Sequence, residues 1–248
     1  MKTYGLIGYP LSQSFSQKYF TNKFEQEAIK ARYLNFPIAS IDEFPELIDH
    51  HPYIGGLNVT IPYKEKVIPY LDELDPIARE AGAVNVIKFD WGNPKKPVLK
   101  GYNSDIIGFT KSIEPLIKAH HKSALILGTG GAAKGVGFAL NRMGLAYKLV
   151  SRTPEGEIQL SYNSLNEKSM ADNQVIINTT PLGMYGDMNA KPEIPYHYCG
   201  KNHLFFDLIY NPEITAFLKA GQKQGAAIKN GLEMLHLQAE GAWEIWNK

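Results

Sequence analysis

The sequence Ser123-Ala-Leu-Ile-Leu-Gly-Thr-Gly-Gly-Ala-Ala-Lys134 joins a short apolar run to a turn that holds three glycines. The run at 123–127 has the length and composition of a buried strand, and apolar side chains then recur at helical spacing from Ala132 to Met143. Another apolar run at 146–150 predicts a second strand. A glycine turn between a strand and a helix, with a strand to follow, is the context of a dinucleotide-binding unit. We therefore expect a Rossmann-type domain in this half of the chain.

The glycine turn has the spacing G-x-G-x-x-G/A, which Gly128, Gly130 and Ala133 occupy. In such a turn the first position allows a tight bend, the second lets the backbone approach a pyrophosphate, and the third permits close helix packing. The phosphate then lies on the helix N-terminus, where free N–H groups point toward it. A tight turn without a ligand is the alternative, and the flanking strands and helix favour dinucleotide binding.

The strand after this helix ends in Ser151-Arg152-Thr153, which bears on the choice of nucleotide. NAD sites place an Asp or Glu at this point, whereas an arginine suits the 2′-phosphate of NADP. No carboxylate occurs before Glu155, and Arg152 can make a charge-assisted contact with phosphate. The alternative is a solvated arginine, but next to the glycine turn the pattern predicts NADP.

The first half of the chain alternates extended and helical patterns. Repeated strand and helix order predicts a mainly parallel sheet with helices on its faces. In the first helix Phe20, Phe24 and Ala28 form one apolar stripe. Over the whole chain, strands are expected at 4–7, 33–38, 56–60, 83–89, 174–178 and 203–208, helices at about 17–30, 42–50, from 62 onward, 76–81, 106–119 and 233–246, and a hairpin-like connection at 90–97.

The segment Asn58-Val-Thr-Ile-Pro-Tyr-Lys64 places a lysine where local helix physics disfavours one. Pro62 suits the first position of a helix, so Lys64 would lie in the first turn, beside the positive end of the helix dipole. A cation there is disfavoured by roughly 0.3–1 kcal/mol. Breaks in local rules tend to occur at functional sites, so Lys64 is a candidate acid or base. The alternative is a surface lysine whose amine reaches water.

Two further segments combine helix capping with possible ligand binding. Ser12-Gln-Ser14-Phe-Ser16 lies between a strand and a helix, so one serine is expected as an N-cap, and two hydroxyls at a helix N-terminus can also hold a carboxylate. Asp105, in Gly101-Tyr-Asn-Ser-Asp105, also has the position of an N-cap. Its alternative role is to hold an ammonium group and a substrate hydroxyl.

The composition excludes several classes of protein. The 26 Lys and Arg residues nearly balance the 25 Asp and Glu residues, so no nucleic-acid partner or acidic membrane surface is expected. No signal peptide is evident, and no apolar stretch approaches the ~20 residues that span a bilayer. Cys199 is the only cysteine, which excludes an internal disulfide and indicates a reducing compartment. We expect a cytoplasmic protein that binds a small molecule.

No metal site or hydrolase motif is expected. His50-His51 and His120-His121 are adjacent pairs, not ligands at helical spacing, and a single cysteine does not make a structural zinc site. The chain also lacks a Gly-x-Ser-x-Gly nucleophile elbow.

Six separated motifs, in one order along nearly the whole chain, resemble the NADP-dependent shikimate dehydrogenase family. They are Gly8-Tyr-Pro-Leu-Ser-Gln-Ser-Phe-Ser16, Asn58-Val-Thr-Ile-Pro-Tyr-Lys-Glu65, Gly82-Ala-Val-Asn85, Gly101-Tyr-Asn-Ser-Asp105, Gly128-Thr-Gly-Gly-Ala-Ala133 and Gly231-Leu-Glu-Met-Leu-His-Leu-Gln-Ala-Glu-Gly-Ala-Trp243. Asn178-Thr-Thr-Pro-Leu-Gly-Met184 and Asp207-Leu-Ile-Tyr-Asn-Pro212 are similar to two further family segments.

The resemblance implies a two-domain α/β fold. Residues 1–103 with 231–248 would form a mainly parallel substrate-binding and catalytic domain, to which the last helix returns, and residues 104–230 an NADP-binding Rossmann domain. The implied activity is the reversible, NADP-dependent reduction of 3-dehydroshikimate to shikimate in chorismate and aromatic amino acid biosynthesis, by a monomer or homodimer.

The resemblance also implies roles for individual residues. Lys64 would be the catalytic acid/base, with Asp105 as its partner. The substrate carboxylate would be bound by Ser14, Ser16 and Tyr210, and the ring hydroxyls by Thr60, Asn85, Asp105 and Gln238. The cofactor would contact Gly128, Thr129, Gly130, Gly131, Ala132, Ser151, Arg152, Thr153, Thr179, Leu208 and Gly231.

Some positions depart from the family pattern. Gln13 stands where a histidine is common and Gln17 where a proline is usual, Ser104 and Ser151 replace a common threonine and asparagine, and no basic residue follows Thr153 closely. We therefore expect this chain to prefer NADP over NAD through Arg152, but by a smaller margin than the full family pattern would give.

Two other functions remain open. One is a catabolic quinate/shikimate dehydrogenase. The other is a catalytically silent dinucleotide- or shikimate-sensing protein, against which intact Lys64 and Asp105 argue.

Overall fold

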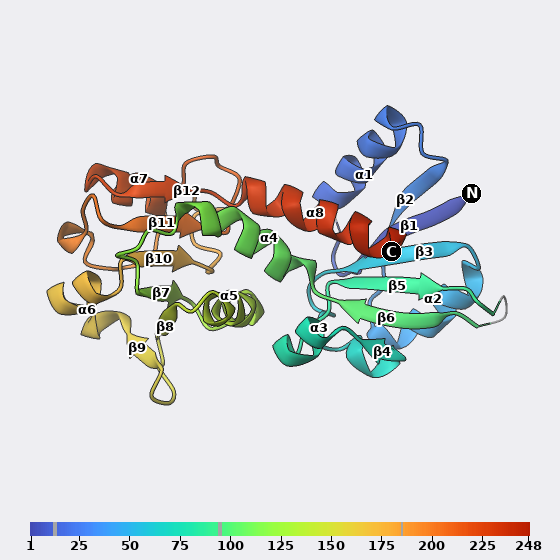
Figure 1. The fold of residues 1–248 in the computed structure, drawn as a ribbon, viewed down its shortest axis with the longest axis horizontal. Coiled ribbons are helices and arrows are strands. Elements are labelled where there is room, and N and C mark those ends of the chain that lie inside the picture. Colours follow the sequence, from blue (N-terminus) through green and yellow to red (C-terminus); the bar gives the residue numbers. More distant parts are fainter. Residues whose placement is uncertain (12–13, 94–95, 185) are drawn as a thin grey trace. The chain divides into compact units, whose positions relative to one another are not determined.

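The computed structural model of the protein describes residues 1–11, 14–93, 96–184 and 186–248, and divides the chain into two compact units (Figure 1). Unit 1 comprises Met1–Asp105 and Gln238–Lys248, and unit 2 comprises Ile106–Leu237. The expected limit at 103/104 lies two residues before the observed one, whereas the expected limit at 230/231 lies seven residues too early, so residues 231–237 belong to unit 2. Both observed limits fall inside helices, since α4 (Ser104–Ile113) and α8 (Leu232–Asn247) each contribute to both units.

Unit 1 is built on a mixed sheet with the order β2-β1-β3-β5-β6-β4. Strand β1 pairs in parallel with β2 and β3, and β4 pairs in parallel with β6, whereas β5 runs antiparallel to both β3 and β6. Because β5 is antiparallel to both of its neighbours, the other five strands all run in one direction, so the expected mainly parallel sheet is confirmed. Strand β5, which leads into the hairpin expected around 90–97, is the one reversed strand of this sheet. The strands are β1 (Lys2–Gly8), β2 (Ala31–Pro37), β3 (Ile54–Val59), β4 (Glu73–Leu74), β5 (Val86–Asp90) and β6 (Val98–Tyr102).

Helices cover both faces of this sheet because side chains alternate along the buried strands. On one face Tyr4 contacts Trp243 and Trp246 of α8, and Phe20 of α1 packs on Trp246. On the other face Ile7 joins a cluster with Phe44 of α2. The helical segments of unit 1 are α1 (Phe15–Gln26), η1 (Ile41–Glu43), α2 (Phe44–His50), η2 (Ile68–Tyr70), α3 (Pro76–Ala81) and the last turns of α8.

The helix expected from Pro62 is absent. The segment 61–67 consists of turns, in which Tyr63 N donates to Thr60 O at 2.9 Å and Val67 N to Tyr63 O at 2.9 Å. The Lys64 carbonyl instead accepts from Val84 N at 2.8 Å, and this tertiary bond takes the place of a helical one. The argument that placed Lys64 beside a helix dipole is therefore wrong, and its position needs another explanation.

The first helix starts and ends earlier than expected. Ser14 is its N-cap, since the side chain accepts from Gln17 N at 3.1 Å, which confirms the prediction that one serine of this segment caps the helix. The helix ends at Gln26, and Ala28 follows with φ of 52° and an exposed side chain. Of the predicted stripe, Phe20 and Phe24 are buried and Ala28 is not.

Unit 2 has an entirely parallel sheet with the order β12-β11-β10-β7-β8-β9. Two strand–helix runs start from its centre and proceed in opposite directions, which is the doubly wound order of dinucleotide-binding domains. The expected Rossmann-type fold is confirmed. The strands are β7 (Ser123–Leu127), β8 (Ala146–Ser151), β9 (Gln159–Ser161), β10 (Val175–Asn178), β11 (Leu204–Asp207) and β12 (Ala227–Lys229).

Helices also lie on both faces of the second sheet. Phe205 of β11 packs on Phe217 of α7, whereas its neighbour Phe206 packs on Phe109 of α4. Helix α4 ends at Ile113, not at 119, because Pro115 cannot continue an α-helix and lies in a 3₁₀ turn. The other helical segments are η3 (Glu114–Leu116), α5 (Gly131–Arg142), η4 (Tyr162–Ser164), α6 (Glu167–Asp172), η5 (Tyr196–Tyr198) and α7 (Ala216–Lys223).

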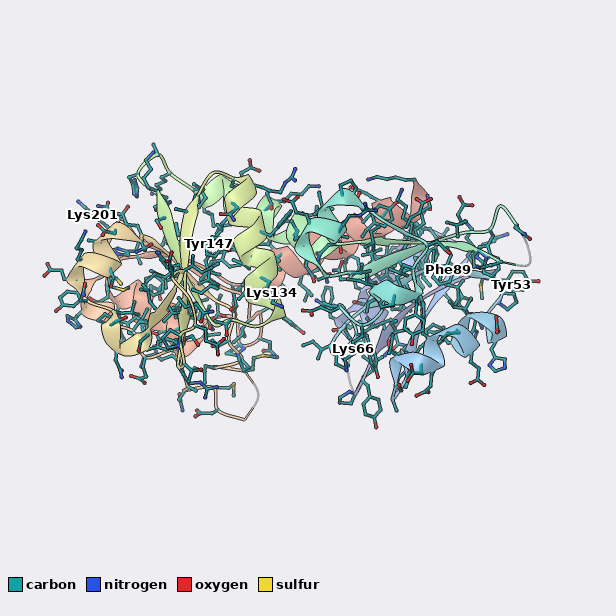
Figure 2. All side chains as sticks on the ribbon, turned by 90° about the horizontal axis from the view of Figure 1, so that it is seen from below. Tyr53, Lys66, Phe89, Lys134, Tyr147 and Lys201 are labelled. Atoms are coloured by element: carbon teal, nitrogen blue, oxygen red, sulfur yellow. The ribbon has the colours of Figure 1, made fainter. Side chains whose placement is uncertain are left out.

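Side chains fill the interior of each unit; of those labelled in Figure 2, Phe89 is buried in unit 1 and Tyr147 is half-buried in unit 2. Within the described ranges, no helix is both long and apolar enough to cross a membrane.

Candidate active site

Lys64 and Asp105 form an ion pair in unit 1, with 2.6 Å between Nζ and Oδ2. Lys64 comes from the turns after β3, where its carbonyl is held by Val84, and Asp105 lies in the first turn of α4. Asp105 is thus inside the helix, one position after its first residue, and not the N-cap that was one interpretation of the sequence. The side chains are 35% and 28% exposed, so the pair can contact a ligand.

Asn85 lies at the centre of a hydrogen-bond network beside this pair. It is 3% exposed, and its Oδ1 accepts from the Ser104 backbone N at 2.6 Å. Its Nδ2 donates to Ser104 Oγ at 3.1 Å and to Gln238 Oε1 at 3.4 Å. The network joins the start of α4, which carries Asp105, to α8, which carries Gln238.

The proposed carboxylate and hydroxyl ligands of unit 1 follow strands β1 and β3. Ser14 and Ser16 lie at the start of α1, shortly after β1, and Thr60 comes directly after β3. Thr60 N donates to Ile7 O at 2.9 Å, which fixes the end of one strand against the other. Both segments stand at carboxyl ends of parallel strands, where open α/β sheets bind their ligands. Ser12 and Gln13, also part of the serine motif, lie outside the described residues.

The glycine turn of unit 2 has the backbone that a dinucleotide site needs. Gly128 has φ of +110°, and a Cβ at this position would lie 2.8 Å from Thr179 Oγ1. Thr179 Oγ1 in turn donates to Leu127 O at 2.7 Å. The carboxyl ends of β7 and β10 are therefore joined at the point where the strand order reverses, which is where Rossmann folds bind nucleotides.

The start of α5 is shaped to receive a phosphate. Gly130 is the N-cap without any side-chain cap bond, and the first turn holds no acidic residue. A Cβ on Gly130 or Gly131 would meet no atom within 4 Å, so space remains beside the backbone N–H groups. An anion is stabilised at such an N-terminus. These features fit the pyrophosphate of a dinucleotide.

The residues that follow β8 are arranged as a polar turn. Ser151 Oγ accepts from Thr153 N at 3.2 Å and donates to Thr153 O at 3.1 Å. Arg152 lies between them with an exposed side chain. This arrangement is compatible with a 2′-phosphate ligand.

Three further residues proposed from the sequence, Leu208, Tyr210 and Gly231, lie in unit 2. Gly231 N donates to Ile209 O at 3.1 Å, which brings Gly231 beside the segment with Leu208. Tyr210 is 40% exposed. It lies in unit 2, whereas the other proposed substrate ligands lie in unit 1.

Sequence reasoning missed several buried polar residues of both units. Tyr33 and Asn58 lie in strands that the apolar pattern identifies only as core, yet Tyr33 Oη donates to Asn58 Oδ1 at 2.7 Å. In unit 2 Asp207 is fully buried and accepts hydrogen bonds from Asn178 Nδ2 at 3.0 Å and Thr215 Oγ1 at 2.6 Å. Asn58, Asn178 and Asp207 do begin motifs of the family resemblance, but nothing in those motifs indicated that their side chains are buried and paired. Among the described residues, no group of three or more His, Cys, Asp or Glu side chains is arranged to hold a metal ion.

Comparison with known proteins relates both units to one family. Residues 6–87 match the model of the shikimate dehydrogenase substrate binding domain. The shikimate dehydrogenase (NADP(+)) of Carboxydothermus hydrogenoformans is 37% identical over 265 residues, which cover 99% of this chain and 91% of that protein. The crystal structure of shikimate dehydrogenase from Aquifex aeolicus has a TM-score of 0.85 at 34% identity and covers 100% of this chain and 92% of its own. The Thermus thermophilus enzyme in complex with NADP(H) and shikimate has a TM-score of 0.84 at 27% identity, with 99% and 93% covered.

Proposed function

The chain belongs to the shikimate dehydrogenase family, and we propose that it reversibly reduces 3-dehydroshikimate to shikimate with NADP as cofactor. The observation that carries this proposal is the Lys64–Asp105 ion pair, which lies partly exposed beside the hydroxyl and amide side chains of unit 1. The proposed role is in chorismate and aromatic amino acid biosynthesis.

The side chains of unit 1 suit a polyhydroxylated carboxylate. We propose that Ser14 and Ser16, together with Tyr210, bind the carboxylate, since hydroxyl groups can donate to an anion without an opposing charge. Thr60, Asn85 and Gln238 offer hydroxyl and amide groups that both donate and accept, as ring hydroxyls require. Asp105 would accept from one of these hydroxyls while it holds Lys64.

Lys64 is the proposed proton donor and acceptor. When bound, NADPH supplies the hydride that reduces the substrate ketone. The oxygen that becomes negative as the carbonyl is reduced takes a proton from the Lys64 ammonium, and in the reverse direction the Lys64 amine accepts the hydroxyl proton. Asp105 orients the amine through its 2.6 Å contact.

The cofactor residues proposed in unit 2 surround the glycine turn and the ends of the neighbouring strands. The open space at Gly130 and Gly131 supports a pyrophosphate contact there, and the exposed side chain of Arg152 supports a contact with the 2′-phosphate. The full proposed set is Gly128, Thr129, Gly130, Gly131, Ala132, Ser151, Arg152, Thr153, Thr179, Leu208 and Gly231.

The alternative functions are not favoured, because the curated relatives are named shikimate dehydrogenase (NADP(+)). The experiment that separates all three functions is NADP reduction by the purified protein, measured by absorbance after addition of shikimate and then of quinate. We expect turnover with shikimate. Turnover with quinate alone would favour the catabolic enzyme, and turnover with neither would favour the sensor.

The cytoplasmic location and the choice between monomer and homodimer remain predictions. Sedimentation of the purified protein at several concentrations distinguishes the two oligomeric states.

A further inference from the structure

Asp207 is a buried carboxylate of unit 2 that none of the proposed cofactor and substrate contacts accounts for. It ends β11, directly opposite Asn178, which ends the neighbouring strand β10 (Figure 1). Both side chains are fully buried. A buried charge is costly unless hydrogen bonds compensate for its lost hydration, so the role of Asp207 has to be sought in its partners.

One oxygen of this carboxylate is held by a helix. Thr215 Oγ1 donates to Asp207 Oδ2 at 2.6 Å and accepts from Leu218 N at 3.3 Å, as the N-cap of α7. Thr215 is also fully buried. Asp207 is therefore fixed against the start of α7, and this leaves its other oxygen, Oδ1, for the end of β10.

The second oxygen decides the direction of an amide. An ionised carboxylate only accepts hydrogen bonds, so the Asn178 group that lies 3.0 Å from Asp207 Oδ1 has to be the Nδ2 donor. Asn178 Oδ1 consequently points the other way, and accepts from Thr180 N at 3.0 Å and from Thr180 Oγ1 at 2.7 Å. A neutral amide at position 207 would allow Asn178 to point in either direction.

The same two residues also hold the segment that follows β11. Ile209 N donates to Asp207 Oδ1 at 3.0 Å, and Leu208 N donates to Asn178 O at 3.1 Å. Asp207 and Asn178 thus fix the loop after β10 and the loop after β11 at once. These loops contain Thr179 and Leu208, two of the proposed cofactor contacts.

Both loops belong to one half of the dinucleotide fold. A doubly wound domain consists of two mononucleotide-binding halves. Arg152, the proposed contact of the 2′-phosphate on the adenosine moiety, follows β8 in the half formed by β7, β8 and β9. The half formed by β10, β11 and β12 is then left for the nicotinamide moiety. We propose that Asp207, acting through Asn178, is a positioning residue for the nicotinamide half of NADP. This inference rests on the proposed function.

The test is Asp207→Asn, which keeps the shape of the side chain and removes the charge that fixes the Asn178 amide. We expect the dissociation constant of NADP, measured by calorimetry, to rise about tenfold, as when a hydrogen bond to a charged group is lost. Adenosine 2′,5′-bisphosphate lacks the nicotinamide, so its dissociation constant should stay within about twofold. An equal loss for both ligands would show that unit 2 is loosened as a whole, and would overturn the inference.

Ser123→Ala is the matched control within unit 2. Ser123 Oγ donates to Asn173 Oδ1 at 2.6 Å at the start of β7, so this variant loses a side-chain hydrogen bond at the opposite end of the parallel strands. Its dissociation constant for NADP should equal that of the wild type.

A double-mutant cycle tests whether Asp207 acts through the amide. Thr180→Val removes the hydroxyl group that donates to Asn178 Oδ1 and keeps the size of this half-buried side chain. If both residues act through Asn178, Asp207→Asn should weaken NADP binding less in the Thr180→Val background than in the wild type. Fully additive effects of the two substitutions would contradict the proposed path.

Thr180→Val is also the second variant should Asp207→Asn not fold. By itself it should weaken the binding of NADP and leave that of adenosine 2′,5′-bisphosphate unchanged. Unchanged NADP binding in the folded variants would overturn the inference alone, whereas absence of wild-type turnover with shikimate would overturn the proposed function as well.

Discussion

Lys64 is placed by contacts with residues distant in the sequence. Its carbonyl accepts from Val84, and its amine pairs with Asp105, which comes from the first turn of α4. The partial exposure of both side chains is as important as the contact between them, because a proton donor must reach its substrate. Surface ion pairs of this kind contribute little to stability, so the pair is better explained by chemistry than by folding.

Replacement of Lys64 tests its role as the proton donor. We expect Lys64→Ala to lower kcat by about 10²–10⁴-fold, the usual contribution of a positioned acid or base, with little change in KM for shikimate. Steady-state kinetics with saturating NADP measure both quantities. Lys66→Ala is the matched control, because Lys66 is exposed on the same segment (Figure 2). Near-normal kcat in Lys64→Ala would remove Lys64 from the mechanism.

Arg152 is the residue on which the cofactor preference depends. We expect Arg152→Ala to raise KM for NADP by about tenfold to a hundredfold, because a charge-assisted contact with the 2′-phosphate is lost. NAD serves as an internal control, since it lacks that phosphate and its KM should not change. An equal loss with both cofactors, or a wild-type preference for NAD in kcat/KM, would contradict this assignment.

At the scale of secondary-structure elements, Asp207 links the ends of β10 and β11 in unit 2. It accepts from Asn178 Nδ2, and Asn178 Oδ1 accepts from Thr180 N at 3.0 Å and from Thr180 Oγ1 at 2.7 Å. Thr180 follows Thr179, which lies against the glycine turn. The buried carboxylate thereby holds the loop that borders the proposed cofactor site. Burial raises the pKa of Asp207 from 3.8 to about 6, against the opposing effect of its hydrogen bonds.

This pKa predicts a pH dependence of stability. The folded protein binds the Asp207 proton more tightly than the unfolded chain does, so the raised pKa makes the wild type lose stability as the pH rises from about 4 to about 6. The loss is on the order of 3 kcal/mol for a shift of about two units. Asp207→Asn has no such loss. We expect the melting temperature of Asp207→Asn minus that of the wild type to increase as the pH rises from about 4 to about 6, and to stay constant above that range.

Asp49→Asn is the control for this experiment, because Asp49 is an exposed carboxylate of α2. Its melting temperature should follow that of the wild type at every pH. Parallel profiles for Asp207→Asn and the wild type would show that Asp207 does not titrate in this range.

At the scale of the whole molecule, the C-terminal helix returns to the unit in which the chain begins. Trp246 is 4% exposed and packs on Tyr4 of β1 and Phe20 of α1, and its Nε1 donates to Ile87 O at 3.1 Å. Residues at opposite ends of the chain thus share one core, and Gln238 reaches Asn85 from the same helix. The last turns of α8 are therefore part of the core of unit 1.

Replacement of the Trp246 side chain by that of alanine should destabilise unit 1 selectively. We expect Trp246→Ala to reduce its free energy of unfolding by about 3–5 kcal/mol, the usual cost of emptying a buried aromatic site. Urea unfolding followed by circular dichroism measures this, and the transition of unit 2 should not move. Trp243→Ala, at a half-buried position of the same helix, should cost less. A loss below about 1 kcal/mol for Trp246→Ala would show that unit 1 does not depend on α8.

The sequence by itself determined the elements whose signals are local. The strand, glycine turn and helix at 123–142 follow from apolar spacing and from backbone demands that glycine alone meets, and Ser14 caps α1 as its position predicts. The motifs of the family resemblance also proposed Lys64, Asp105 and Asn85 as site residues.

Only the tertiary structure decided how these residues are held. The segment after Pro62 is not a helix, because the Lys64 carbonyl bonds to Val84 instead of to a residue four positions along. Tyr33 and Asp207 acquire their significance from partners brought together by neighbouring strands, which no local pattern encodes. Local propensity fixes the backbone of a short segment, whereas a buried polar side chain takes its role from whatever the fold places beside it.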